Sequence, residues 1–125
     1  MMTALRGVAA AAAIGAVAIG AAACATASAT QRTSDAETAA MAPLKHAYPA
    51  VVMGFDVPAE TTLVVSLDLQ AYENMDDDAA AAMERRTVTN WLHAWRDAHP
   101  GRHALVHVRF IDFIGRTILQ RSARV

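Results

Sequence analysis

The chain has 125 residues, a length that suits one domain with one core. Its formal net charge of -1 argues against a generally basic nucleic-acid binder and against a strongly acidic solubilising protein. The 54% share of hydrophobic residues is inflated by alanines near the N-terminus, so it describes one segment and not the core of a domain.

The N-terminal segment has the layout of a secretory signal. Arg6 is followed by an uncharged stretch from Gly7 to Gln31, and residues 8–23 consist only of Ala, Gly, Val and Ile. The few Val and Ile residues insert too weakly to favour a permanent membrane anchor. We therefore predict a signal peptide over residues 1–23, extending to 29 on a second route, and an exported protein that is periplasmic, secreted or lipid-anchored to the cell envelope.

Two processing routes remain open. Residues 21–24, Ala-Ala-Ala-Cys, resemble a bacterial lipobox, and this resemblance implies that Cys24 is lipidated and becomes the mature N-terminus. Residues 27–29, Ala-Ser-Ala, form a small-residue cleavage site that releases a soluble protein beginning at Thr30. Since Cys24 is the only cysteine, no intramolecular disulfide stabilises the domain.

Residues 24–45 are predicted to form a disordered linker or tether. From Ala25 to Pro43 the composition is dominated by Ala, Thr and Ser, and Met41 is the only large apolar side chain. Such a segment buries too little surface to offset the entropy of ordering the chain. The folded domain is therefore predicted over residues 46–125.

The first half of this domain shows two strand patterns. An apolar run from Val51 to Phe55, ended by Asp-Val-Pro at 56–58, favours a first strand and a turn. Residues 62–70 then alternate between apolar and polar side chains, a pattern typical of a half-buried strand.

A long amphipathic helix is predicted next. The stretch from Asn74 to Ala98 lacks Gly and Pro and opens with aspartates at 76–78, which favour a helix N-terminus. Apolar residues recur on one side at steps of three and four: Ala80, Met83, Val88, Trp91, Leu92, Trp95 and Ala98. We expect the two tryptophans to lie at the centre of the core and Pro100 and Gly101 to end the helix.

Alternation resumes from His103 to Phe113, and Gly115 is expected to take a positive φ in the turn that leads to a last strand over 116–121. The predicted fold class is two-layer α+β: a small mixed sheet in ββαββ order, covered on one face by one long amphipathic helix. The helical crossover predicts that the second and third strands are parallel. The sheet edges are candidates for pairing with a partner.

Charge is distributed unevenly along the chain. Residues 24–84 carry ten acidic and two basic side chains, whereas residues 85–125 carry eight arginines and two aspartates. The simpler interpretation is that these charges compensate on the solvated faces of one fold. The sharper hypothesis is an arginine surface formed by Arg85, Arg86 and Arg96 that meets an anionic envelope component, such as lipid headgroups or acidic glycan.

Four histidines lie within residues 93–107, but their spacing disfavours a shared metal ion. His93 and His99 are on different sides of the predicted helix, and the Cα atoms of His103 and His107 are about 13 Å apart on a strand. His93 and Asp97 are helical neighbours, yet two ligands do not define a zinc site. With no glycine-rich phosphate loop or nucleophile elbow in the sequence, we assign no catalytic, cofactor-binding or metal-binding residue.

The leading functional hypothesis is a non-enzymatic binding module of the cell envelope. Its expected partner is another envelope protein or an anionic surface component; contact with a membrane is expected only through a lipid anchor, and nucleic acid is not an expected partner. The alternative is a small periplasmic hydrolase or metal-dependent enzyme built around His93, Asp97, His103 and His107.

Overall fold

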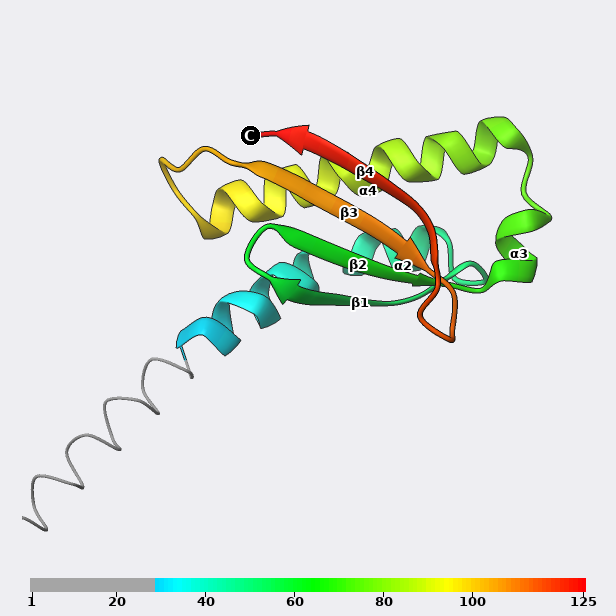
Figure 1. The fold of residues 1–125 in the computed structure, drawn as a ribbon, viewed down its shortest axis with the longest axis horizontal. Coiled ribbons are helices and arrows are strands. Elements are labelled where there is room, and N and C mark those ends of the chain that lie inside the picture. Colours follow the sequence, from blue (N-terminus) through cyan, green and yellow to red (C-terminus); the bar gives the residue numbers. More distant parts are fainter. Residues whose placement is uncertain (1–28) are drawn as a thin grey trace, which may run out of the picture. The chain divides into compact units, whose positions relative to one another are not determined.

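The computed structural model describes residues 29–125, of which residues 34–125 form one compact unit. The predicted signal peptide and Cys24 lie outside the described residues. The compact unit combines helices with a four-stranded mixed sheet, which confirms the α+β class (Figure 1). No helix among residues 29–125 is long and apolar enough to cross a membrane.

The strands lie side by side in sequence order: β1 (Val52–Ala59), β2 (Thr62–Leu67), β3 (Leu105–Ile111) and β4 (Thr117–Arg124). β1 is antiparallel to β2 and β3 to β4, whereas β2 and β3 are parallel. The parallel pair confirms the prediction from the helical crossover. β1 and β4 are the edge strands of this sheet.

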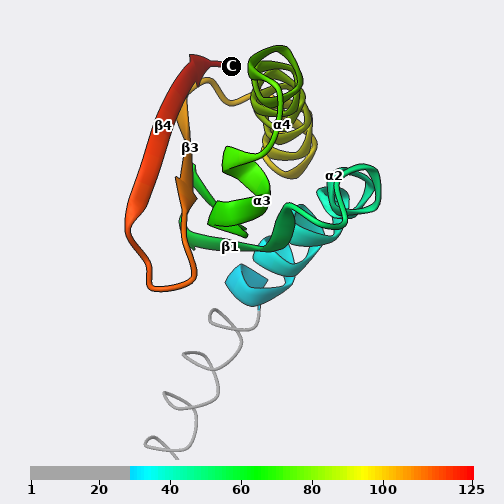
Figure 2. The ribbon, with the colours of Figure 1, turned by 90° about the vertical axis from the view of Figure 1, so that its right-hand side faces the viewer.

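Three labelled helices lie on one side of the sheet: α2 (Ala42–Ala47), α3 (Leu69–Glu73) and α4 (Asp77–Ala98) (Figure 2). The long predicted helix is α4, but the expectation that it covers the sheet alone is corrected by the presence of α2 and α3. One helix is about 10 Å wide, whereas four strands at a spacing of about 4.8 Å span some 15 to 20 Å. A single helix therefore leaves part of the sheet face uncovered.

The structure also differs from the expected tether. Residues 29–40 are helical, α2 follows, and the side chains of Met41 and Leu44 are fully buried in the core. Pro43 stands in the first turn of α2, where its missing N–H costs no helical hydrogen bond. The alanine-rich composition gave no sign of this burial, because only a few large apolar side chains of the segment enter the core.

Local capping explains where β2 ends. Its alternating pattern was expected to continue to Gln70, but the Asp68 side chain accepts a hydrogen bond from the N–H of Ala71 at 2.9 Å and starts α3 instead. In the β3–β4 turn, Gly115 has a φ of +87°, as expected. β1 extends through Pro58 with irregular pairing, which an edge strand tolerates.

The core lies between the sheet and the helices. Trp91, Trp95 and Phe110 are its largest fully buried side chains, which confirms the central place of the two tryptophans. Thr87 is not on the predicted apolar face of α4, yet it is fully buried. Its hydroxyl donates to the carbonyl of Met83 at 2.7 Å, which offsets the cost of burying this polar group.

Candidate functional site: a groove between α4 and the edge strand β4

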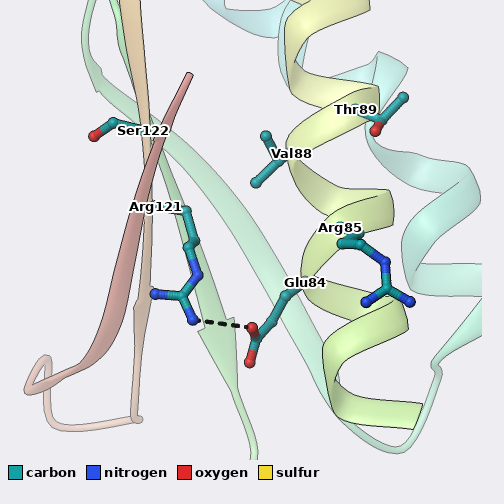
Figure 3. Close-up of a pocket in the computed structure, with 6 residues that line it drawn as sticks. All are labelled: Glu84, Arg85, Val88, Thr89, Arg121 and Ser122. Atoms are coloured by element: carbon teal, nitrogen blue, oxygen red, sulfur yellow. Dashed lines mark hydrogen bonds and ion pairs between the residues drawn. The ribbon is translucent and has the colours of Figure 1, made fainter. Parts of the chain in front are cut away.

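A hollow of about 300 Å³ separates α4 from β4 at the surface. The residues that line it come from these two elements alone: Glu84, Arg85, Val88, Thr89, Arg121 and Ser122 (Figure 3). It lies beside the free edge of the sheet, because β4 is the last strand in the sheet order. We call this hollow the β4 groove.

Helical periodicity and strand register position the side chains of the β4 groove. Glu84 and Val88 are one turn apart on α4 and point toward β4, whereas Arg85 and Thr89 lie about 100° further round the helix (Figure 3). On β4, Arg121 is paired with the buried Val108 and so stands on the side of the sheet that faces α4. The next residue on β4 points to the opposite face.

Glu84 links three elements. One carboxylate oxygen accepts a hydrogen bond from the Tyr72 hydroxyl at 2.9 Å, and the other lies 3.4 Å from a guanidinium nitrogen of Arg121. Burial of the phenol, reinforced by its bond to the Glu84 carboxylate, raises the pKa of Tyr72 above its ordinary value. Because the Arg121 side chain is half exposed, the ion pair contributes little stability and leaves its charge accessible to a ligand.

The outer edge of β4 offers regularly spaced backbone groups. The N–H of Val125 donates to the carbonyl of Ala104 at 3.0 Å, and the register then pairs each β4 residue with one β3 residue up to Leu119. Because hydrogen-bonded pairs alternate along an antiparallel ladder, Gln120, Ser122 and Arg124 direct their N–H and C=O groups to the free edge. Another strand can bind along this edge without disturbing the pairing of β3 with β4.

A strand bound there also reaches the β4 groove. Side chains of adjacent strands continue on the same faces, so every second residue of the added strand points toward the side of α4 that carries Val88. β4 contains no acidic residue, and within residues 29–125 neither Arg85 nor Arg124 has an ion-pair partner. The site therefore combines exposed backbone donors and acceptors, one apolar contact, and two lining arginines, Arg85 and Arg121, against one carboxylate, Glu84.

The opposite edge of the sheet is less suited to pairing. The pairing of β1 with β2 is irregular between Val52 and Gly54 and again between Asp56 and Ala59, and Pro58 has no N–H to donate. Bulges and prolines of this kind protect an edge strand from association. β4 is therefore the better edge for binding.

The structure does not gather the three arginines of the predicted anion-binding surface at one point. Arg85, Arg86 and Arg96 are all exposed on α4. Arg85 and Arg96 share a face of the helix at a separation of about 17 Å, while Arg86 lies about 100° away from Arg85. Only Arg85 lines the β4 groove. Cys24 lies outside the described residues.

The residues of the enzymatic alternative come from three places. His93 and Asp97 are exposed on α4; His103 precedes β3 and contacts the carbonyl of Val125; His107 contacts the Ser122 hydroxyl at 2.7 Å. Across residues 29–125, no three His, Cys, Asp or Glu side chains are placed to hold one metal ion. The described part of the chain therefore supplies no residue set that favours this alternative.

Sequence reasoning did not identify Tyr72, Glu84 or Arg121. They are separated by up to 49 positions and belong to three elements, so no spacing rule relates them before the fold is known. The only signal was the mixture of an acidic helix start and a basic last strand. No family model matches the chain, and no curated protein or solved structure matches it either.

Proposed function

We propose that this protein is an exported binding module of the cell envelope that takes up an extended, acidic segment of a partner protein along β4. The observation that carries the proposal is the position of the β4 groove directly beside the free edge of the sheet. Strand addition supplies affinity through backbone hydrogen bonds, and the groove supplies preference for particular side chains.

Charge favours an acidic partner over a second copy of the chain. Antiparallel pairing of two β4 strands centred on Ser122 places Arg121 of one copy diagonally opposite Arg121 of the other, on the face toward α4. Like charges opposite each other on paired strands are destabilising. A segment with Glu or Asp at alternate positions instead places its carboxylates on one face of the sheet. They lie toward Arg85 and Arg121 when they point to α4, or toward Arg124 when they point to the opposite face, where Arg124 is paired with Leu105.

The test uses a fluorescein-labelled peptide as long as β4, 8 residues, in which Val alternates with Glu. The matched control peptide carries Lys in place of each Glu. We expect saturable binding of the Glu peptide by fluorescence anisotropy and binding of the Lys peptide that is weaker by about tenfold or more.

Two variants of one position separate strand addition from surface attraction. Gln120→Pro removes an N–H that points to the free edge and keeps the hydrogen bonds between β4 and β3. It is therefore expected to lower the affinity for the Glu peptide by about tenfold. Gln120→Ala keeps that N–H and is expected to bind as the parent protein does. If Gln120→Pro binds the Glu peptide normally, or if both peptides bind equally well, strand addition at β4 is wrong.

The export part of the proposal has its own experiment. Intact mass of the protein from membrane and soluble fractions of its host is expected to show a form that starts at Cys24 with added acyl chains or a form that starts near Thr30. A full-length chain beginning at Met1 in the soluble cytoplasmic fraction contradicts export and leaves the peptide-binding proposal intact.

A further inference from the structure

The β3–β4 turn end of the sheet exposes large apolar side chains. Phe113 is 89% exposed, Ile114 61% and Met53 55%, although each belongs to a residue type that folding normally covers. Phe113 and Met53 also line one hollow of about 420 Å³, which is separate from the β4 groove. We call it the turn hollow. Its lining residues Leu67, Asp68 and Leu69 place it where β2 leads into α3. The ribbon of Figure 1 shows the β3–β4 turn at this same end of the sheet.

Hydrogen bonds hold this turn in one shape. The buried carboxylate of Asp112 accepts from the N–H of Ile114 at 3.1 Å, from the N–H of Arg116 at 2.9 Å and from the Arg116 guanidinium at 2.9 Å. Gly115 donates its N–H to the Asp112 carbonyl at 3.0 Å. Because the turn is already ordered in the folded protein, binding of a partner to Phe113 loses little further conformational entropy.

The lining of the turn hollow combines apolar walls with acidic side chains. The apolar walls come from Met53, Leu67, Leu69 and Phe113. Asp68, Gln70 and Glu73 supply the polar rim, and both carboxylates are exposed. Glu73 forms no ion pair within residues 29–125, and Asp68 uses one oxygen to cap α3. The hollow therefore has an apolar floor and uncompensated negative charge.

We propose that the turn hollow is a second binding site, which takes an aliphatic side chain flanked by Lys or Arg from a partner protein. The aliphatic group fills the space between Met53, Leu69 and Phe113, and the basic groups meet Asp68 and Glu73. The argument for this occupant is the complementarity of charge around an apolar hollow.

The same charges disfavour two other occupants. An anionic lipid surface is repelled by Asp68 and Glu73, and the one basic group of the turn, Arg116, is already paired with Asp112. A symmetric dimer through this hollow brings the acidic rims of two copies together. The site also goes beyond the β4 groove, because the two sites prefer segments of opposite charge.

The probe is the tripeptide acetyl-Lys-Leu-Lys-amide, titrated into the whole ¹⁵N-labelled protein and followed by amide chemical shifts. We expect saturable shifts confined to residues around the turn hollow, such as Met53, Leu69 and Phe113. Acetyl-Glu-Leu-Glu-amide is expected to bind at least about fivefold more weakly, as is acetyl-Lys-Ser-Lys-amide.

Variants with matched charge changes localise the effect. Glu73→Lys and Phe113→Ser are expected to abolish saturable shifts, and both positions are exposed, so folding is retained. Asp97→Lys makes the same change in net charge on the exposed face of α4 and is expected to leave the titration unchanged. Gln120→Pro is also expected to leave it unchanged, so that failure at one site is distinguishable from failure at the other.

Three results would overturn the proposal. The first is the absence of saturable shifts, or equal shifts with the Glu tripeptide. The second is co-sedimentation with phosphatidylcholine or phosphatidylglycerol vesicles that depends on Phe113, since the surface is then a membrane contact. The third is self-association that Phe113→Ser abolishes, since the occupant is then a second copy.

Discussion

The indole of Trp95 stacks on the imidazole of His99, with ring centroids 4.5 Å apart and planes inclined by 22°. The Trp95 Nε1–H donates to the carbonyl of Glu60 at 3.0 Å, and the Arg102 guanidinium lies 5.8 Å from the centre of the Trp95 ring system. Arg102 also pairs with the Glu60 carboxylate. These contacts fasten the C-terminal end of α4 to the turn between β1 and β2.

The first prediction compares the two buried tryptophans. Trp95→Phe loses the hydrogen bond to Glu60 and part of the stacked area on His99, whereas the Nε1–H of Trp91 is buried with no acceptor among residues 29–125. Trp95→Phe is therefore expected to lower the free energy of unfolding by about 1 to 3 kcal/mol more than Trp91→Phe. Urea unfolding of both variants measures the difference. Equal losses in the free energy of unfolding would show that the Trp95 contacts with Glu60 and His99 add no stability.

The second prediction concerns Glu37, which is only 3% exposed and has a carboxylate oxygen without a hydrogen-bond partner within residues 29–125. Burial raises the pKa of Glu37 above 4.5; nearby His99 opposes this effect and Glu60 adds to it. A carboxyl group whose pKa is raised by folding stabilises the folded state at pH values below its ordinary pKa. That stability is lost as the pH rises through the folded-state pKa.

Glu37→Gln removes this titration. Its unfolding midpoint in urea, relative to the parent protein, is expected to rise steadily as pH increases from 4.5 toward neutrality. A difference between Glu37→Gln and the parent that does not change with pH contradicts a raised pKa.

The third prediction concerns Asp112, whose pKa is shifted by folding in the opposite direction to that of Glu37. Although burial of its carboxyl works against ionisation, hydrogen bonds from Arg116 and Ile114 lower the pKa of Asp112 below 3.8. Stability from this group is present above 3.8 and is lost as pH falls through the lower, folded-state pKa. Asp112→Asn is expected to be less stable than the parent at neutral pH and to lose part of the acid dependence, as thermal unfolding across the acid range measures.

The fourth prediction addresses the β4 groove. Glu84→Gln removes the negative charge that raises the pKa of Tyr72 and frees Arg121, whose charge lowers it. The Tyr72 hydroxyl is therefore expected to ionise at a lower pH in this variant, closer to 10.0. Ultraviolet titration of tyrosinate measures the change, with Tyr72→Phe identifying the contribution of Tyr72. An unchanged titration means that Glu84 does not contact Tyr72 in solution.

Local periodicity in the sequence was enough to predict much of the fold. The step of three and four residues identified α4 and its tryptophans, and alternation identified β2 and β3, because each pattern depends on neighbours along the chain. The same rule wrongly extended β2 to Gln70, because an alternating pattern gives no sign that Asp68 caps α3. It also overlooked Met41 and Leu44, which are too few to form a periodic pattern.

The candidate sites were less accessible to sequence reasoning. Glu84 and Arg121 are 37 positions apart, and Met53 and Phe113 are further apart still. Nothing in their local sequence marks them as neighbours. The sequence indicated that a sheet edge could pair with a partner. The choice of β4 over β1 depends on the observed strand register and on the irregular pairing around Gly54.

The amino-acid sequence by itself determined the α+β class, the long helix, the two tryptophans of the core and the parallel crossover. These follow from short-range periodicity and from the length of chain between strands. Only the tertiary structure decided which edge lies beside α4, which acidic side chain meets Arg121 and which apolar side chains stay exposed at the turn. Those relationships arise when distant segments pack together, and the free energy of such contacts depends on spatial distance and burial and not on separation along the chain.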